Sequence, residues 1–180
     1  MKLLAVETST LTGAVGLMEA DAAVAECRLN IAVTHSERLL AAVDSLLGTA
    51  RWTLGEVDAL AVAVGPGSFT GLRIGVSTVK SLAFATGKPL CAVPTLDAMA
   101  ACLPFAAHPV CPILDARKDE VYTSLYRTTD GRPERLWEYR AMAPAALAEA
   151  LDREAHGPVV FLGDGVGPWR ELLRGALGAR

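Results

Sequence analysis

The chain has 180 residues, of which 52% are hydrophobic and 21% charged, with a formal net charge of −3 at pH 7. This composition excludes a disordered chain and is typical of a globular protein with one domain or two small lobes. The basic side chains are scattered, so the sequence lacks the basic stripe of a protein that binds nucleic acid by itself.

The first half of the chain predicts a strand and a hairpin, followed by alternating helices and strands. Thr34 and Glu37 match a capping box, and Gly87 is placed to end the second helix. The predicted elements are strands at 3–6, 13–18 and 22–29, a helix at 34–48, a strand at 60–64, a helix at 70–86 and a strand at 90–93.

The second half predicts a smaller group of strands and helices. These are a helix at 96–103, strands at 110–114 and 121–127, a helix at 145–151, a strand at 159–162 and a C-terminal helix after GDGVGP (163–168). Prolines gather between Leu103 and Pro112, so we place a lobe boundary there, with lobes at 1–104 and 105–180. The order of elements predicts a layered α/β fold with a mixed sheet.

The targeting and redox signals are those of a cytoplasmic protein. MKLLAVETST reads as a first strand and not as a signal peptide, and no apolar run is long enough to span a membrane. The four cysteines show no metal-ligand spacing, and a core of this size needs no disulfides. We therefore expect reduced thiols.

A glycine-rich segment, GPGSFTGLRIG, occupies residues 65–75. It is not a P-loop, because Leu72 and Arg73 stand where that motif has lysine and a hydroxyl residue. Its GxGxxxG spacing also departs from the dinucleotide fingerprint. We favour a tight turn with close helix packing over phosphate binding.

A second polar segment, ETSTLTG (7–13), follows the first predicted strand. A carboxylate with neighbouring hydroxyls is suited to a metal-bound phosphate, and the same residues are common in polar turns. Both interpretations stay open at this point. The candidate nucleotide-binding residues are Glu7, Thr8, Ser9 and Thr10.

Other reactive groups give no catalytic or metal site. The three histidines, His35, His108 and His156, lack the spacing of a zinc pair, and there is no GxSxG nucleophile motif. The cluster of Asp115, Arg117, Asp119 and Glu120 is better explained as a solvated charged turn.

The predicted helix at 70–86 is small or apolar on almost every side. Its only charges, Arg73 and Lys80, lie close together on the helical wheel. Such a helix is either buried on two sides or covered by a partner.

Several motifs in chain order resemble the TsaB (YeaZ) family of the bacterial tRNA threonylcarbamoyladenosine pathway. They are ETST, HSERLL, VGPGSFTGLRIGVSTVKSLAFATGKPLCAVPTLDAMA, LDARKDEVY and FLGDG. The resemblance implies an α/β fold of the actin-like ATPase (ASKHA, ribonuclease H-like) type, with a truncated second lobe.

The resemblance also implies a non-catalytic scaffold or activator of the TsaD-type threonylcarbamoyltransferase. That enzyme modifies the adenosine next to the anticodon in tRNAs reading codons that begin with adenine. A TsaE-type ATPase is a further partner, tRNA is contacted at most indirectly, and no cofactor is expected. The catalytic relative carries an HxxxH metal pair where this sequence has Thr95 and Met99, and neither supplies an imidazole.

Partner binding is expected on the two predicted helices at 34–48 and 70–86. The candidate partner-binding residues are His35, Leu39, Leu40, Val43, Phe69, Gly71, Leu72, Gly75, Val76 and Val79. Gly71 and Gly75 are expected to let a neighbouring subunit come close, and the chain alone is expected to pair with itself. Gly75→Glu or Leu39→Glu is then expected to abolish partner binding and leave the fold intact.

Two other functions compete with this interpretation. A small ATP-dependent phosphotransferase of the same superfamily would use Glu7 or Asp115 with a metal. A metallopeptidase is less well supported, because the sequence has no histidine pair.

Overall fold

A computed structural model describes residues 1–30, 36–155 and 157–178. The chain forms two compact units, Met1–Pro94 and Thr95–Arg180. The predicted boundary after residue 104 is therefore too late. The reason is that helix α3 (Thr95–Ala101) packs on the second sheet, where Leu96 and Ala100 contact Val110 and Leu114.

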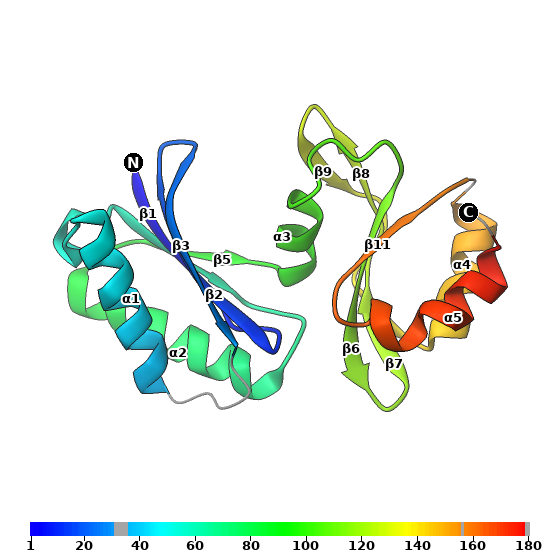
Figure 1. Ribbon diagram of the computed structural model, residues 1–180, viewed down its shortest axis with the longest axis horizontal. Helices are drawn as coiled ribbons and strands as arrows, with labels where there is room; N and C mark the ends of the chain where they lie inside the picture. Colours follow the sequence, from blue (N-terminus) through cyan, green and yellow to red (C-terminus); the bar gives the residue numbers. More distant parts are fainter. Residues whose placement is uncertain (31–35, 156, 179–180) are drawn as a thin grey trace. The chain divides into compact units, whose positions relative to one another are not determined.

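The first unit contains a five-stranded mixed sheet in the order β3-β2-β1-β4-β5 (Figure 1). Its strands are β1 (Lys2–Glu7), β2 (Thr12–Glu19), β3 (Ala22–Asn30), β4 (Ala59–Ala63) and β5 (Leu90–Val93). The first three strands pair antiparallel, and β4 and β5 then add in parallel on the other side of β1. All five predicted strands are confirmed within two residues at each end.

Helices α1 (Ser36–Ala50) and α2 (Phe69–Thr86) lie together on one face of this sheet (Figure 1). Alternation along β1 points Leu4 and Val6 toward them. The core of the first unit contains buried apolar residues from both the strands and the helices, including Leu17, Leu39, Val43, Leu46, Leu60, Val62 and Val79. The predicted capping box of α1 lies outside the described residues because it begins at Thr34.

The ends of α2 follow the sequence signals. Ser68 is the N-cap, and its hydroxyl oxygen accepts the N–H of Gly71 at 3.3 Å. Gly87 closes the helix with φ 68°, a left-handed conformation that glycine adopts without strain. The helix therefore spans the predicted range, with Phe69 added at its start.

A short 3-10 turn, η1 (Leu54–Glu56), carries a capping box that the sequence analysis did not identify. The carboxylate of Glu56 accepts the N–H of Thr53 at 2.8 Å and its hydroxyl at 2.9 Å. Lys2 lies 3.2 Å from the same carboxylate. The Thr53 hydrogen bonds, with Lys2, lower the pKa of Glu56 to about 2.

This capping box makes the stability of the first unit depend on pH. A carboxyl whose pKa is lower in the folded state stabilises the fold above its unfolded pKa and loses that effect on protonation. We expect the free energy of unfolding to fall as the pH drops from about 4.5 toward about 2. Urea unfolding across this range should show a shallower pH dependence for Glu56→Gln, and equal slopes would contradict the assignment.

The second unit contains a six-stranded sheet with the path β10-β7-β6-β8-β9, and β11 pairs with β6. Its strands are β6 (Val110–Arg117), β7 (Glu120–Thr123), β8 (Tyr126–Thr129), β9 (Arg132–Arg135), β10 (Arg140–Met142) and β11 (Val160–Leu162). The single strand predicted at 121–127 is wrong, since Ser124 and Leu125 separate β7 from β8. The Ser124 hydroxyl donates to the carbonyl of Trp137 at 2.7 Å, and the carbonyl of Leu125 accepts the N–H of Leu136 at 2.7 Å.

Alternation along β6 divides the second unit into two cores. Val110 and Leu114 face α3, whereas Cys111 and Ile113 face the pair α4 (Pro144–Glu154) and α5 (Val166–Leu177). The helix predicted at 145–151 is confirmed, and the predicted C-terminal helix is present but begins at Val166, inside the segment 163–168 that was expected to precede it. All four cysteines are free, and burial raises the pKa of Cys111 to about 12.

Candidate functional site

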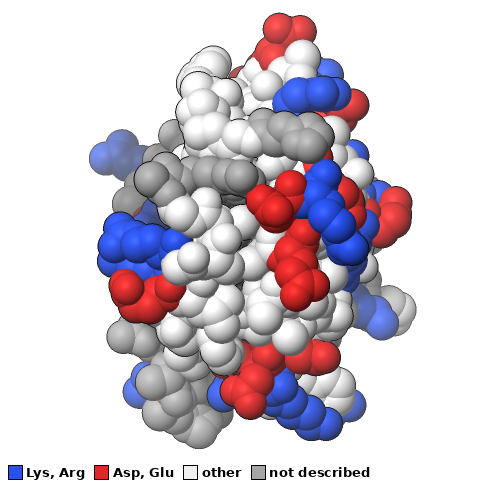
Figure 2. Space-filling model, turned by 90° about the vertical axis from the view of Figure 1, so that its right-hand side faces the viewer, with Lys and Arg blue, Asp and Glu red and all other residues white. Residues whose placement is uncertain are grey.

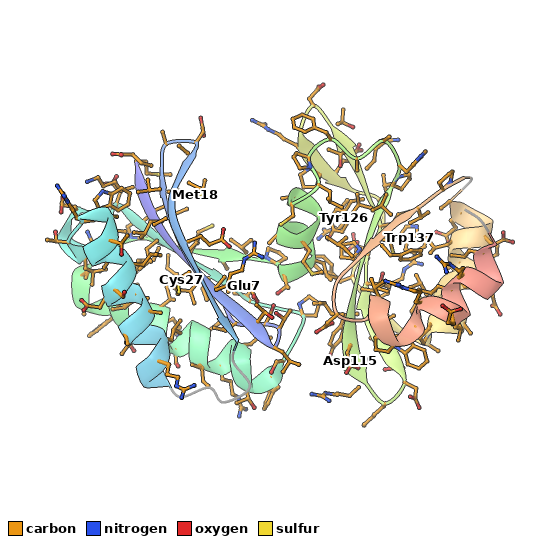
Figure 3. All side chains as sticks on the ribbon, viewed as in Figure 1. Glu7, Met18, Cys27, Asp115, Tyr126 and Trp137 are labelled. Carbon is orange, nitrogen blue, oxygen red and sulfur yellow. The ribbon has the colours of Figure 1, made fainter. Side chains whose placement is uncertain are left out.

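The two polar segments of the first unit meet at one edge of its sheet. Strands β1 and β4 are parallel neighbours, so their carboxyl ends lie at the same edge. Glu7 ends β1 (Figure 3), and the glycine turn follows β4. The N–H of Ser68 in this turn donates to the carbonyl of Ser9 at 2.6 Å.

The glycines of this turn are needed because β1 and α2 approach each other closely. A Cβ added at Gly67 would overlap the carbonyl oxygen of Ser9. A Cβ at Gly71 would overlap the carbonyl oxygen of Thr8, and one at Gly75 would overlap its hydroxyl. Close packing, which the sequence favoured over phosphate binding, therefore accounts for these glycines.

The hydroxyls of the ETST segment also serve this junction. The Thr8 hydroxyl donates to the carbonyl of Gly71 at 2.8 Å, and Ser9 donates both its N–H and its hydroxyl to the Glu7 carboxylate. Thr8 and Ser9 are 1% and 2% exposed. The polar groups of Thr8 and Ser9 are hydrogen-bonded inside the first unit. Nucleotide binding stays a prediction, which now depends on Glu7 and Thr10, the two half-buried candidates.

The outer side of α1 and α2 carries the exposed members of the predicted partner-binding set. Leu40 is 46% exposed and Phe69 is 67% exposed. On α2, Leu72 and Val76 are half-buried, and Val76 also packs against the core of the first unit. The Arg73 guanidinium stacks over the Phe69 ring at 3.7 Å from its centroid. We call Leu40, Phe69, Leu72 and Val76 the outer helix surface.

The other described members of the set do not face outward. Leu39, Val43 and Val79 are at most 4% exposed and belong to the core of the first unit. Gly71 and Gly75 face Thr8 of the same chain, so the expectation that they admit a neighbouring subunit is wrong. His35 lies outside the described residues.

The charged turn of the second unit is a solvated loop, as the sequence indicated. Asp115, Arg117, Asp119 and Glu120 are all exposed at the β6–β7 turn (Figure 3 labels Asp115). The Asp115 carboxylate accepts the N–H of Arg117 at 2.8 Å, which closes the turn. Within the described residues, no group of three side chains is placed to hold a metal ion.

A partly buried polar cluster in the second unit escaped the sequence analysis. The Asp97 Oδ1 atom accepts the hydroxyl of Tyr126 at 2.6 Å and that of Tyr139 at 2.8 Å. Burial, together with the Asp97 carboxylate, raises the pKa of both tyrosines. The cluster joins α3 to β8 and to the segment before β10, and Figure 3 shows Tyr126 in the interior of this unit.

The positions of the absent histidine pair are used for packing. Thr95 is 2% exposed and its hydroxyl has no hydrogen-bond partner in the described structure. The Met99 methyl group lies 2.8 Å from where a Cβ on Gly163 would stand. Neither side chain supplies an imidazole.

Comparison with known proteins identifies relatives over the whole chain. A family described as TsaD, tRNA N6-adenosine threonylcarbamoyltransferase, matches residues 30–164. The tRNA threonylcarbamoyladenosine biosynthesis protein TsaB of Bacillus subtilis is 34% identical over 180 residues, which cover 100% of this chain and 78% of that protein. The protein of the same name from Escherichia coli is 32% identical over 177 residues, covering 96% and 75%.

Solved structures agree with these sequence relatives. YeaZ from Pseudomonas aeruginosa matches with a TM-score of 0.76 and 31% identity, over 90% of this chain and 84% of that one. A ROK hexokinase from Thermus thermophilus matches with a TM-score of 0.56 and 13% identity, over 98% and 88%. The second likeness concerns the fold alone and supports the actin-like ATPase type.

None of the described helices is long and apolar enough to cross a membrane.

Proposed function

Because the chain belongs to the TsaB (YeaZ) members of the TsaD family, we propose that it binds and activates a TsaD-type threonylcarbamoyltransferase as a non-catalytic scaffold. The chain takes part in tRNA threonylcarbamoyladenosine biosynthesis. The adenosine next to the anticodon, in tRNAs reading codons that begin with adenine, is the target of the partner enzyme. A TsaE-type ATPase joins the assembly, and the chain alone forms a homodimer.

The outer helix surface is the observation that carries this proposal. It exposes a leucine and a phenylalanine on two adjacent helices that are packed on a rigid sheet. Large apolar side chains at the centre of an interface contribute most of the binding energy, and a rigid support lowers the entropic cost of association. An isolated copy carries the same apolar side chains, and pairing them with those of a second copy around a two-fold axis would give a homodimer that competes with the heterodimer.

The chemistry of the second unit supports the non-catalytic role. Thr95 and Met99 occupy the positions of the metal pair that the resemblance assigns to the catalytic relative. At the other candidate site, in the first unit, the hydroxyls of Thr8 and Ser9 are already hydrogen-bonded to Gly71 and Glu7 of the same unit. The ATP-dependent phosphotransferase therefore gains no support from these two residues.

The decisive test is a charge placed on the outer helix surface. Light scattering after size-exclusion chromatography should give a homodimer for the chain alone and a one-to-one heterodimer after addition of a purified TsaD-type enzyme. Phe69→Glu and Leu40→Glu should each weaken the heterodimer by about thirtyfold or more, because each removes an apolar side chain from the interface and places a charge there. Circular dichroism should show an unchanged fold, since both side chains are exposed.

Phe105→Glu is the matched control, because Phe105 is 89% exposed and belongs to the second unit. It makes the same chemical change away from the outer helix surface and should leave heterodimer affinity unchanged. Wild-type affinity in folded Phe69→Glu and Leu40→Glu proteins would refute the proposed surface. Failure of the wild-type chain to bind the enzyme would refute the scaffold function itself.

A further inference from the structure

The exposed side of α2 carries a row of two phenylalanines and two cations. Phe69 and Phe84 are 67% and 93% exposed, and Arg73 and Lys80 are exposed between them. At about 3.6 residues per turn, the four side chains leave the helix within a sector of about 60°, so they follow one line along it. We call these four residues the α2 row.

The α2 row is symmetric along the helix. Its order is phenylalanine, cation, cation and phenylalanine, and both pairs are centred on the point between Val76 and Ser77. Val76 also belongs to the outer helix surface, which carries the proposed homodimer and heterodimer. A two-fold axis at that point would place two antiparallel copies of the row against each other.

The charge of the α2 row has one sign only. Helix α2 contains Arg73 and Lys80 and no acidic residue. Within the described residues neither cation forms an ion pair, and the Arg73 guanidinium stacks over the ring of Phe69. Figure 2 shows a different arrangement around α4 and α5 of the second unit, where acidic and basic side chains lie beside each other. On a chain with a net charge of −3, the α2 row is a local positive surface.

Two-fold pairing of the α2 row favours its aromatic residues and opposes its cations. Antiparallel copies bring Phe69 of one copy toward Phe84 of the other, and Arg73 of one toward Lys80 of the other. Like charges that face each other across an interface oppose association. A protein with carboxylates at the facing positions would instead form charge-assisted hydrogen bonds with the same two cations.

We propose that Arg73 and Lys80 select the TsaD-type enzyme over a second copy of this chain. They repel the like-charged row of that copy and attract carboxylates on the facing surface of the enzyme. This inference rests on the proposed function, because it assigns the specificity of the same helices. Apolar side chains supply most of the affinity of both dimers, and the cations decide which of the two prevails.

Lys80→Glu is expected to change the two dimers in opposite directions. In the homodimer the new carboxylate lies opposite Arg73 of the other copy, twice around the axis, so self-association should tighten by at least about tenfold. In the heterodimer the same carboxylate meets carboxylates of the enzyme, so the affinity should fall by at least about tenfold. Sedimentation velocity of the full chain, alone and with the purified enzyme, measures both dissociation constants. Circular dichroism should show an unchanged fold, since Lys80 is exposed.

Arg73→Glu combined with Lys80→Glu separates local pairing from net charge. Both charges of the row are then negative, so two copies repel each other again and self-association should be at least about tenfold weaker than for Lys80→Glu alone. A general effect of added negative charge would move the single and the double variant in the same direction. Lys118→Glu is the matched control, because Lys118 is exposed in the second unit and the change in net charge is the same. It should leave both dissociation constants at their wild-type values.

Salt gives an independent measurement on the wild-type chain. Raising NaCl from about 50 mM to about 500 mM screens exposed charges, so the heterodimer should weaken and the homodimer should not. The selection by these cations is overturned if Lys80→Glu fails to tighten the homodimer or to weaken the heterodimer, or if Lys118→Glu has equal effects. In each of these cases the wild-type heterodimer still forms and the scaffold function stands. A wild-type chain that forms no heterodimer would refute the scaffold function, and this inference with it.

Discussion

Gly71→Val is expected to lower the free energy of unfolding of the first unit by more than about 4 kcal/mol. A side chain at this position would overlap the carbonyl oxygen of Thr8, which is part of the backbone and cannot rotate away. The helix would have to move off β1 and open the core beneath it. Urea denaturation followed by circular dichroism measures the effect directly.

Gly48→Ala is the control for this experiment. Gly48 also lies in a helix, yet a Cβ there would have no atom within 4 Å. Alanine should therefore stabilise the first unit by about 0.5–1 kcal/mol through helix propensity alone. A Gly71→Val protein as stable as the wild type would show that α2 does not pack on β1 as described.

Gly75→Ala is also expected to destabilise the first unit, but here a second substitution should restore part of the lost stability. A Cβ at Gly75 would overlap the Thr8 hydroxyl and not the backbone, so Gly75→Ala should be partly rescued by Thr8→Ala, whereas Gly71→Ala should not. The sequence-based expectation that Gly75→Glu or Leu39→Glu leaves the fold intact is wrong, because Gly75 has no room for a side chain and Leu39, 3% exposed, belongs to the core. Loss of partner binding in either variant would report unfolding and not a damaged interface.

Asp97→Ala is expected to destabilise the second unit by about 2–4 kcal/mol. Two tyrosine hydroxyls share one oxygen of this carboxylate, and its removal leaves the buried hydroxyl of Tyr126 without that acceptor. Tyr139→Phe removes one of the two bonds at a more exposed position and should cost less than Asp97→Ala. Thermal denaturation of the three proteins ranks the losses.

The same cluster is expected to make the stability of the second unit fall at alkaline pH. Both tyrosines have a pKa raised above the ordinary value of 10, so the folded state holds their protons more firmly than the unfolded state. Their contribution to stability is complete below about pH 10 and is lost as the pH rises further. An Asp97→Ala protein whose stability matches that of the wild type at neutral pH would contradict this account.

Much of the fold could be predicted because its central strands are continuous apolar runs. Residues 60–64 predicted β4 for this reason, and the helix at 70–86 was bounded by glycine signals that act locally. Strands β9 and β10 were missed because they are short and mostly exposed, without apolar alternation. The separation of β7 from β8 depends on a bond from Ser124 to Trp137, which no local pattern reveals.

The site was predictable in composition but not in geometry. The sequence indicated close packing at Gly71 and Gly75, yet it gave no means of telling a neighbouring subunit from the chain's own Thr8. Thr8 and Gly71 are 63 positions apart and meet only because β1 and β4 are parallel neighbours. The Asp97 cluster likewise joins residues 29 and 42 positions apart, and no periodic pattern links them.

The position of the boundary at Pro94 has a consequence for biosynthesis. Every strand of the first sheet lies within the first 94 residues, and every strand of the second lies after them. At about 5–20 residues per second, the ribosome needs roughly 4–17 s to add residues 95–180. The first unit has its complete sheet before the second unit is synthesised, so it can fold first, as N-terminal domains generally do.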